Sequence, residues 1–166
     1  MAARPWAAPA LVAGLSAGAL AFAFLAQYGF GLVPCALCIY QRWPFALALL
    51  LGLIGLGLVR SGRSPAPALA LAGLALLVNA GLAVYHVGVE QHWWQGTAAC
   101  TGVLGASASL EELKAQILAA PVVRCDEIAW SFLGLSMAGW NVPLSAGLAA
   151  FGLVMARRLS GGRATA

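Results

Sequence analysis

Apolar residues fill four long stretches of the chain, and most polar residues are confined to the segments between them. The stretches extend over about 10–30, 43–59, 67–87 and 132–156. A helix that crosses a bilayer needs roughly 20 mostly apolar residues, within a range of about 17–25. Each stretch is long enough to span. The pattern therefore predicts an all-α membrane protein, a four-transmembrane-helix bundle folded as a single domain over residues 1–166.

Two of the stretches leave a choice at their start. The first could be a secretory signal peptide, but its apolar core exceeds the usual length of about 7–15 residues, and Arg4 is the one positive charge before it. A retained helix is favoured. Pro44 either begins the second span or kinks a helix that starts nearer Cys35. Asn79, inside the third stretch, predicts a hydrogen bond between helices.

The longest polar segment, about 88–131, predicts an extramembrane loop. It contains all five acidic residues and two of the four cysteines, Cys100 and Cys125. Ser109 and Glu112 have the spacing of a helix capping box. A short amphipathic helix is expected after this box, whose apolar face either packs on the protein or lies on the bilayer surface. The apolar positions of this helix, before Pro121, are Leu110, Leu113, Ile117 and Leu118.

The composition indicates that these spans lie in a membrane, and the distribution of basic residues predicts their orientation in it. Hydrophobic residues make up 62% and charged residues 8% of the chain, against roughly 45–50% and 25% in soluble domains. The net charge of +4 comes from scattered residues without a basic stripe, which argues against nucleic acid binding. Six basic residues fall on the side of the termini and three on the loop side. The positive-inside rule then predicts that the termini are cytoplasmic and that the loop lies on the opposite side of the membrane.

Cys35 and Cys38 have the C-x-x-C spacing that brings two thiols onto one helix face, where they can form a disulfide or act as a redox dithiol. Arg42 lies four residues after Cys38, so in a continuous helix its guanidinium would favour the Cys38 thiolate. A zinc site and two inert buried cysteines remain alternatives. The spacing of 25 between Cys100 and Cys125 favours a loop disulfide over a second close pair of metal ligands. That disulfide could be purely structural.

Three features together resemble the DsbB family of membrane disulfide-forming proteins. They are the segment Pro34-Cys35-Ala36-Leu37-Cys38-Ile39-Tyr40-Gln41-Arg42, the single long loop with Cys100 and Cys125, and the segment Trp130-Ser131-Phe132-Leu133-Gly134-Leu135-Ser136-Met137-Ala138-Gly139-Trp140-Asn141. The resemblance covers nearly the whole chain. The relay of DsbA, DsbB and a quinone is the established system of this kind.

The resemblance implies a division of labour among the cysteines. Cys100 and Cys125 would be presented to a periplasmic thiol oxidase of thioredoxin fold, similar to DsbA, with Cys100 attacked by the incoming thiolate. Cys35 would reoxidise that pair by exchange with Cys100. Cys38 would pass electrons to a quinone of the membrane pool, either ubiquinone or menaquinone.

The resemblance also implies quinone-binding residues. Arg42 matches the family arginine associated with the quinone, and His86 corresponds to a family histidine near it, although His92 competes for that role. Gln41 stands where acidic residues are familiar in the family, and Pro44 is unusual. Both departures would affect the fine properties of the site and not the type of reaction that it carries out.

The identity of the electron acceptor also follows from what the sequence lacks. The chain contains neither a G-x-G-x-x-G dinucleotide motif nor a C-x-x-C-H haem attachment motif. DsbA has a potential of about −120 mV, so its regeneration needs a more oxidising acceptor, which a lipid-dissolved quinone provides. Two alternatives remain: a related thiol oxidoreductase with a dedicated partner or another acceptor, as in vitamin K epoxide reductase-like enzymes, and a non-enzymatic membrane protein with a structural disulfide and metal-bound cysteines.

Overall fold

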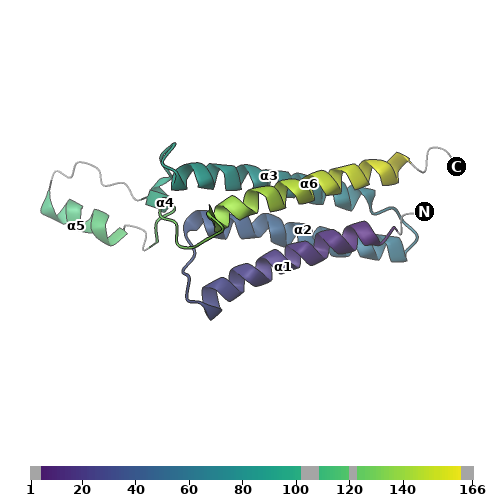
Figure 1. The fold of residues 1–166 in the computed structure, drawn as a ribbon, viewed down its shortest axis with the longest axis horizontal. Coiled ribbons are helices and arrows are strands. Elements are labelled where there is room, and N and C mark those ends of the chain that lie inside the picture. The colour runs from purple at the N-terminus through teal and green to yellow at the C-terminus, as the bar shows by residue number, and fades with distance from the viewer. Residues whose placement is uncertain (1–4, 102–108, 120–122, 162–166) are drawn as a thin grey trace.

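Four long helices lie side by side and form an elongated bundle (Figure 1). The computed structural model describes residues 5–101, 109–119 and 123–161. All four helices are long and apolar enough to cross a membrane, so the predicted four-transmembrane-helix bundle is confirmed. Residues 5 and 161 lie at one end of the bundle, and the two short helices of the loop lie at the other. The long helices are α1 (Ala7–Gly29), α2 (Ala36–Arg60), α3 (Ala66–Glu90) and α6 (Met137–Gly161).

Helix α2 begins earlier than the apolar pattern predicts. It starts at Ala36 rather than at 43 and continues through Pro44. Proline interrupts the helical hydrogen bonds of the preceding turn, but the helix is continuous across this point. Cys38 and Arg42 therefore lie on one uninterrupted helix.

Helix α6 begins later than predicted, because residues 131–136 form a β-hairpin. The prediction of a span from 132 was wrong at this boundary. Strands β1 (Ser131–Phe132) and β2 (Leu135–Ser136) pair antiparallel. Leu133 and Gly134 join them, with φ of 51° and 80°. Positive φ at both central residues is typical of a type I′ turn, whose twist closes a two-residue hairpin loop.

Small residues allow the helices to approach closely. A Cβ atom on Gly73 of α3 would lie 2.8 Å from Leu153 Cγ and 3.1 Å from the Ala149 carbonyl oxygen of α6. A Cβ atom on Gly52 of α2 would lie 2.8 Å from Ala13 Cβ of α1. Helices in lipid associate through such close packing rather than through hydrophobic burial. The bundle is therefore held together by small-residue contacts between α1 and α2 and between α3 and α6.

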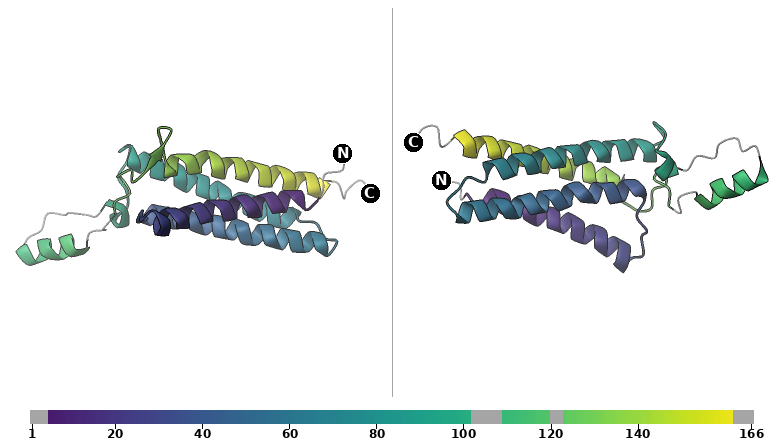
Figure 2. Two further views of the ribbon diagram at one scale, coloured as in Figure 1. Left: turned by 60° about the horizontal axis from the view of Figure 1, so that its bottom comes forward. Right: turned by 180° about the vertical axis from the view of Figure 1, so that it is seen from behind.

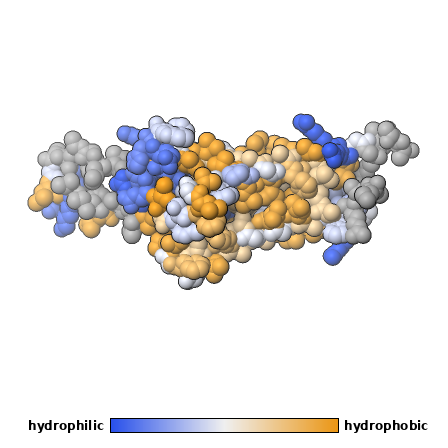
Figure 3. All heavy atoms as spheres, in the orientation of Figure 1, coloured by the Kyte–Doolittle hydropathy of each residue, from blue (hydrophilic) through white to orange (hydrophobic). Residues whose placement is uncertain are grey.

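The face of the bundle seen in Figure 3 is mostly apolar along its length and hydrophilic at its two ends. Large apolar side chains point outward from all four helices. A soluble protein rarely exposes an apolar surface of this extent, so the bundle surface matches a lipid environment. Examples of the exposed side chains are Leu15, Phe22, Leu47, Leu50, Leu53, Leu71, Leu74, Val78 and Val154.

The loop contains helices α4 (Ala98–Thr101) and α5 (Leu110–Ala119). The Ser109 hydroxyl accepts a hydrogen bond from the Glu112 backbone N–H at 3.2 Å, which is the predicted helix cap. Leu110 and Leu118 are each 78% exposed, and α5 extends away from the bundle (Figure 2). These two leucines do not pack on the protein, so the alternative in which the apolar face of this helix packs on the bundle does not hold for them. The side chains of Leu113 and Ile117 lie outside the described part of the structure.

Candidate active site

The C-x-x-C thiols lie at the first turn of helix α2. Cys35 is the N-cap residue, with extended backbone (φ −72°, ψ 170°), and its Sγ accepts a hydrogen bond from the Cys38 backbone N–H at 3.3 Å. The two Sγ atoms lie 2.8 Å apart, so one thiol can donate to the other. Both cysteines are free. Their proximity allows a disulfide between them to open and close with little movement of the backbone.

Cys35, just before the spanning helix α2, is the thiol that the site activates. The hydrogen bond from Cys38 lowers the pKa of Cys35 well below its usual range, burial opposes this effect, and His86 lowers the pKa further. The thiolate is the nucleophilic form of cysteine. The sequence predicted a stabilised thiolate at Cys38, but the structure favours Cys35, because Cys35 Sγ accepts a hydrogen bond from the Cys38 backbone N–H and lies beside His86.

His86 of α3 contacts the thiol pair. Its Nε2 lies 3.6 Å from Cys35 Sγ and 3.9 Å from a carboxylate oxygen of Glu90, one helical turn further along α3. Its Nδ1 lies 3.0 Å from Gln41 Nε2. His86 is 3% exposed, whereas His92 is exposed to solvent. Of the two histidines that the sequence offered, the structure therefore brings His86 to the cysteines.

Arg42 points toward helix α1, not toward the cysteines. Its guanidinium donates a hydrogen bond to Gln27 Oε1 at 2.6 Å and lies 5.1 Å from the centre of the Phe24 ring. The expected contact with the Cys38 thiolate is therefore replaced by contacts with α1. Among the described residues, Arg42 Nε is buried and has no hydrogen-bond partner. A buried donor without a partner is costly, which makes Nε available to an acceptor that enters the site.

The second cysteine pair adjoins the first. Cys100 and Cys125 form the disulfide that their spacing favoured, with their Cα atoms 4.9 Å apart. Both are completely buried, and they share one apolar cluster with Cys35, Leu37 and Val89. The segment between α3 and α4 folds back on the bundle through Trp94, whose ring nitrogen donates to the Tyr85 carbonyl at 3.0 Å. The loop thus holds its disulfide against the start of α2.

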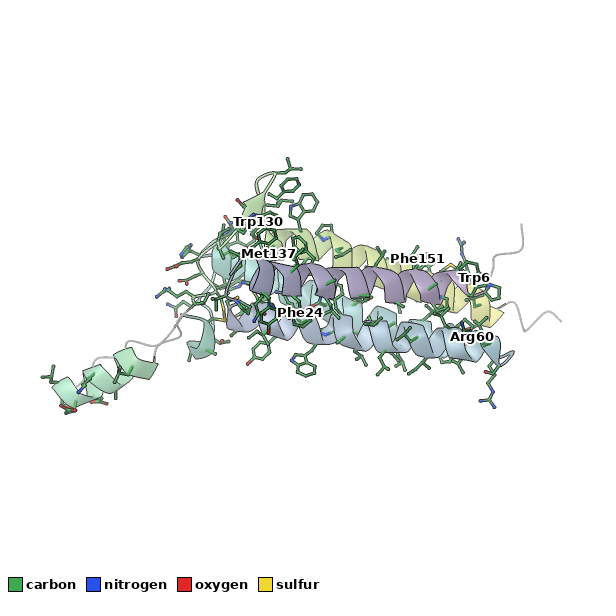
Figure 4. All side chains as sticks on the ribbon, turned by 90° about the horizontal axis from the view of Figure 1, so that it is seen from below. Trp6, Phe24, Arg60, Trp130, Met137 and Phe151 are labelled. Carbon is green, nitrogen blue, oxygen red and sulfur yellow. A yellow bond between two sulfur atoms is a disulfide. The ribbon has the colours of Figure 1, made fainter. Side chains whose placement is uncertain are left out.

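A cavity of about 560 Å³ opens beside the thiols, between α1, α2, α6 and the segment 123–132. Its polar groups include Cys38, Arg42 and His86, and the rest of its lining is mostly apolar and aromatic. Phe24, Trp130 and Met137 are grouped at this end of the bundle (Figure 4). A mostly apolar pocket with few polar groups is typical of a small-molecule site. Apolar lining residues include Leu20, Phe22, Ala26, Phe45, Trp130, Phe132 and Leu144.

The same thiols could also hold a metal ion. The sulfur atoms of Cys35 and Cys38 and a ring nitrogen of His86 all lie within 4.8 Å of one another. Zinc binds sulfur at about 2.3 Å and imidazole nitrogen at about 2.0–2.1 Å, commonly with four ligands. The site therefore supplies two sulfur ligands and one imidazole nitrogen. The metal site that the sequence left as an alternative would lie at these three residues.

Sequence reasoning missed several polar partners of the site. Glu90 is buried, accepts a hydrogen bond from the Ser136 hydroxyl, and its pairing with His86 follows from the i, i+4 spacing on α3. Gln41 links His86 to Asn141 of α6. The link between α2 and α6 joins residues 100 positions apart, which no local pattern signals. Asn79 does make the predicted interhelical hydrogen bonds, to Asn141 and Ser145.

Fold and site together define a multi-pass membrane protein with a dithiol and a disulfide at one end of a four-helix bundle. The family described as "Disulfide bond formation protein DsbB" matches residues 5–155. The chain is 36% identical over 142 residues to disulfide bond formation protein B of Xanthomonas campestris pv. campestris, covering 82% of this chain and 81% of the relative. It is 32% identical over 154 residues to disulfide bond formation protein B of Aromatoleum aromaticum, covering 88% and 89%.

The chain belongs to the DsbB family, as its sequence motifs predicted. It is therefore a membrane disulfide-forming protein, and its family implies a disulfide oxidoreductase activity. No solved structure gives a significant match to the chain.

Proposed function

We propose that this protein is a thiol:quinone oxidoreductase of the bacterial inner membrane. It reoxidises a periplasmic, DsbA-like thiol oxidase of thioredoxin fold and passes the electrons to the membrane quinone pool. The observation that carries the proposal is the single apolar cluster that contains Cys35, Cys100 and Cys125. This cluster adjoins the cavity that contains Arg42. Exchange between the pairs and reduction of an acceptor can thus occur within one site.

The first step is exchange with the partner. A thiolate of the reduced partner attacks Cys100 Sγ, which is completely buried here and must first become accessible. The attack breaks the Cys100–Cys125 bond and forms a mixed disulfide. The second thiolate of the partner then displaces Cys100. The partner leaves with a disulfide, and two electrons and their protons remain on Cys100 and Cys125.

The second step is exchange within the protein. The Cys100 thiolate attacks Cys35 of an oxidised Cys35–Cys38 pair, and Cys125 then displaces Cys35 from the mixed disulfide. The loop disulfide forms again, and Cys35 and Cys38 become a dithiol. The lowered pKa of Cys35 makes it a good leaving group in this step.

The cavity residues suit a quinone as the final acceptor. When bound, a quinone takes up two electrons and two protons as Cys35 and Cys38 return to a disulfide. The unpartnered Arg42 Nε can donate to a quinone carbonyl oxygen, and the apolar lining suits the ring and the first part of its chain. Both ubiquinone and menaquinone have this chemistry. Positive charge at this point also stabilises the negative charge that develops on the acceptor.

Steady-state turnover with a reduced DsbA-like partner and a soluble quinone tests the proposal. Cys38→Ser should abolish quinone reduction but leave the loop disulfide able to oxidise one equivalent of partner. Cys100→Ser should block oxidation of the partner. Continued turnover by Cys38→Ser would contradict the assignment of the quinone-facing pair.

A second candidate is a metal-binding protein without redox activity, which the cluster of Cys35, Cys38 and His86 favours. It predicts a stoichiometric metal ion in the protein purified without chelators, and loss of that ion in Cys35→Ser. Metal analysis of the same preparation used for turnover separates the two candidates. Quinone reduction by metal-free protein would exclude the metal-binding candidate.

A further inference from the structure

A chain of buried polar side chains runs from the thiols into the middle of the bundle. Gln41 of α2, His86 and Asn79 of α3, and Ser145 of α6 are all at most 7% exposed. Asn141 of α6 joins them. Helix α3 places Asn79 and His86 seven residues apart, which is two turns on one face.

Each hydrogen bond in this chain points the same way. Asn79 Nδ2 donates to Asn141 Oδ1 at 3.3 Å and to Ser145 Oγ at 2.8 Å, and Ser145 Oγ donates to Asn141 Oδ1 at 2.7 Å. Asn141 Nδ2 donates to Gln41 Oε1 at 2.5 Å. Gln41 Nε2 is then directed at His86 Nδ1, 3.0 Å away. His86 Nδ1 receives this bond and must be the unprotonated ring nitrogen.

If these hydrogen bonds ran in the opposite direction, the buried polar groups would be less well paired. Among the described residues, Asn79 Oδ1 is buried without a hydrogen-bond partner. If all three amides were turned over, the NH₂ group of Asn79 would be left without a partner instead. Orphaned buried donors are rarer in proteins than orphaned carbonyl oxygens. The observed direction is therefore the one that the bundle favours.

We infer that Asn79, Asn141, Ser145 and Gln41 are positioning residues that fix the tautomer of His86, with its proton on Nε2 and directed at Cys35. In a histidine, the hydrogen bond made by one ring nitrogen determines which nitrogen carries the proton. Nε2 lies 3.6 Å from Cys35 Sγ. The Nε2–H group of His86 can then donate to the Cys35 sulfur.

This inference rests on the proposed function for its catalytic meaning, because it concerns the same thiol. A thiolate that receives a fixed donor is held ready for exchange with Cys100. With the proton on Nδ1, Nε2 would have no hydrogen to donate and would repel the sulfur lone pairs. Glu90, 3.9 Å from Nε2, is the other group that this proton can reach.

The position of the proton can be measured by ¹⁵N NMR of the reduced, full-length protein in detergent with labelled histidine. The chain has two histidines, and the exposed His92 serves as an internal reference. A ring nitrogen that carries a proton and one that does not have widely separated shifts. We expect His86 to show an unprotonated Nδ1 and a protonated Nε2. A protonated Nδ1 in the wild-type protein would overturn the inference.

Asn141→Asp is the sharpest variant, because Asn141 hydrogen-bonds to Gln41, Asn79 and Ser145 and reaches His86 only through Gln41. A carboxylate at 141 accepts only, so Gln41 must turn its NH₂ group toward it and present Oε1 to His86. We expect the proton of His86 to move to Nδ1. An unchanged tautomer of His86 in folded Asn141→Asp would contradict the inference that these hydrogen bonds fix it. Ser16→Ala is the matched control. Its buried hydroxyl on α1 is not part of this hydrogen-bonded network, so the substitution should leave the tautomer of His86 unchanged.

Gln41→Glu gives the same test if Asn141→Asp does not fold, because a carboxylate next to Nδ1 can only accept from it. The rate of exchange between Cys35 and the loop pair should fall about tenfold in either variant, as expected when a hydrogen bond to a charged group is lost. The NMR experiment uses neither quinone nor partner. A failed tautomer prediction therefore leaves the thiol:quinone function standing, and absent quinone turnover leaves the tautomer result standing.

Discussion

Arg42 on helix α2 donates a hydrogen bond to Gln27 Oε1 on helix α1 at 2.6 Å. This contact fixes the guanidinium at the wall of the cavity, with Phe24 stacked on it and Nε unpaired among the described residues. The arginine thus lines the cavity and contacts α1 rather than Cys38. Its role in the proposed reaction is to bind the quinone.

Arg42→Ala should raise the KM for quinone about tenfold or more, the factor expected for loss of a hydrogen bond from a charged donor. Arg42→Lys should recover part of this loss, because it keeps the charge without the planar fork. Raising the pH should not rescue Arg42→Ala, since the guanidinium does not contact the thiols. Arg60→Ala, at the opposite end of the same helix, is the control. A KM in Arg42→Ala equal to that of the wild type would remove Arg42 from the quinone site.

The pH dependence of Cys35 provides a second prediction. Because its pKa is lowered, the thiolate is present at neutral pH, and reactivity is lost only as pH falls through that lowered pKa. The rate of alkylation at Cys35, followed by mass spectrometry in the reduced protein, should be nearly constant above pH 7. An ordinary thiol with a pKa of about 8.5 would instead gain roughly tenfold per unit below that value.

His86→Ala should move this inflection to higher pH, because the histidine contributes to lowering the pKa of Cys35. His92→Ala should leave it in place, since His92 is exposed and outside the site. A steep rise in alkylation rate between about pH 7 and 8 in the wild type would show that Cys35 is an ordinary thiol.

The proposed orientation in the membrane rests on the count of basic residues, six on the side of the termini against three on the loop side. Single cysteines introduced by Lys114→Cys on α5 and Arg63→Cys at the other end of the bundle, in a cysteine-free background, report the two sides. A membrane-impermeant thiol reagent should label Lys114→Cys in intact spheroplasts and Arg63→Cys only after lysis. The reverse pattern would invert the orientation.

Packing between α3 and α6 predicts a stability effect at Gly73. Gly73→Ala places a Cβ atom 2.8 Å from Leu153 Cγ and 3.1 Å from a backbone oxygen, and overpacking of this kind costs about 1–3 kcal/mol. Gly81→Ala on the same helix meets nothing within 4 Å and should cost no stability. Thermal unfolding of both variants in the same detergent checks this difference. Equal melting temperatures would argue against close packing at Gly73.

The sequence predicts the bundle well, because spans depend on local hydropathy. It also predicts the cysteine pairs, since C-x-x-C spacing and one long loop limit how four thiols can combine. The start of α6 was missed, because a hairpin of two-residue strands is set by the positive φ of Leu133 and Gly134 rather than by hydropathy. The direction of Arg42 was missed as well, because Gln27 lies on another helix.

Long-range polar contacts are the part of the site that the sequence does not encode locally. Asn141 was visible as a polar residue in an apolar stretch, but its partner Gln41 lies on a different helix. Glu90 was visible as an acidic residue at the end of a span, four positions after His86. Its carboxylate accepts a hydrogen bond from the hairpin residue Ser136, which the predicted span placed inside a helix.

Anaerobic mixing of the fully reduced protein with a soluble quinone tests the central claim, transfer of electrons from the cysteines to a quinone, without any partner protein. Four thiols hold four electrons, so each molecule should reduce two equivalents of quinone as the absorbance of the oxidised quinone disappears. Both disulfides should re-form, and Cys38→Ser should reduce none. Thiols that stay reduced in the presence of quinone, or an undiminished yield from Cys38→Ser, would contradict the account.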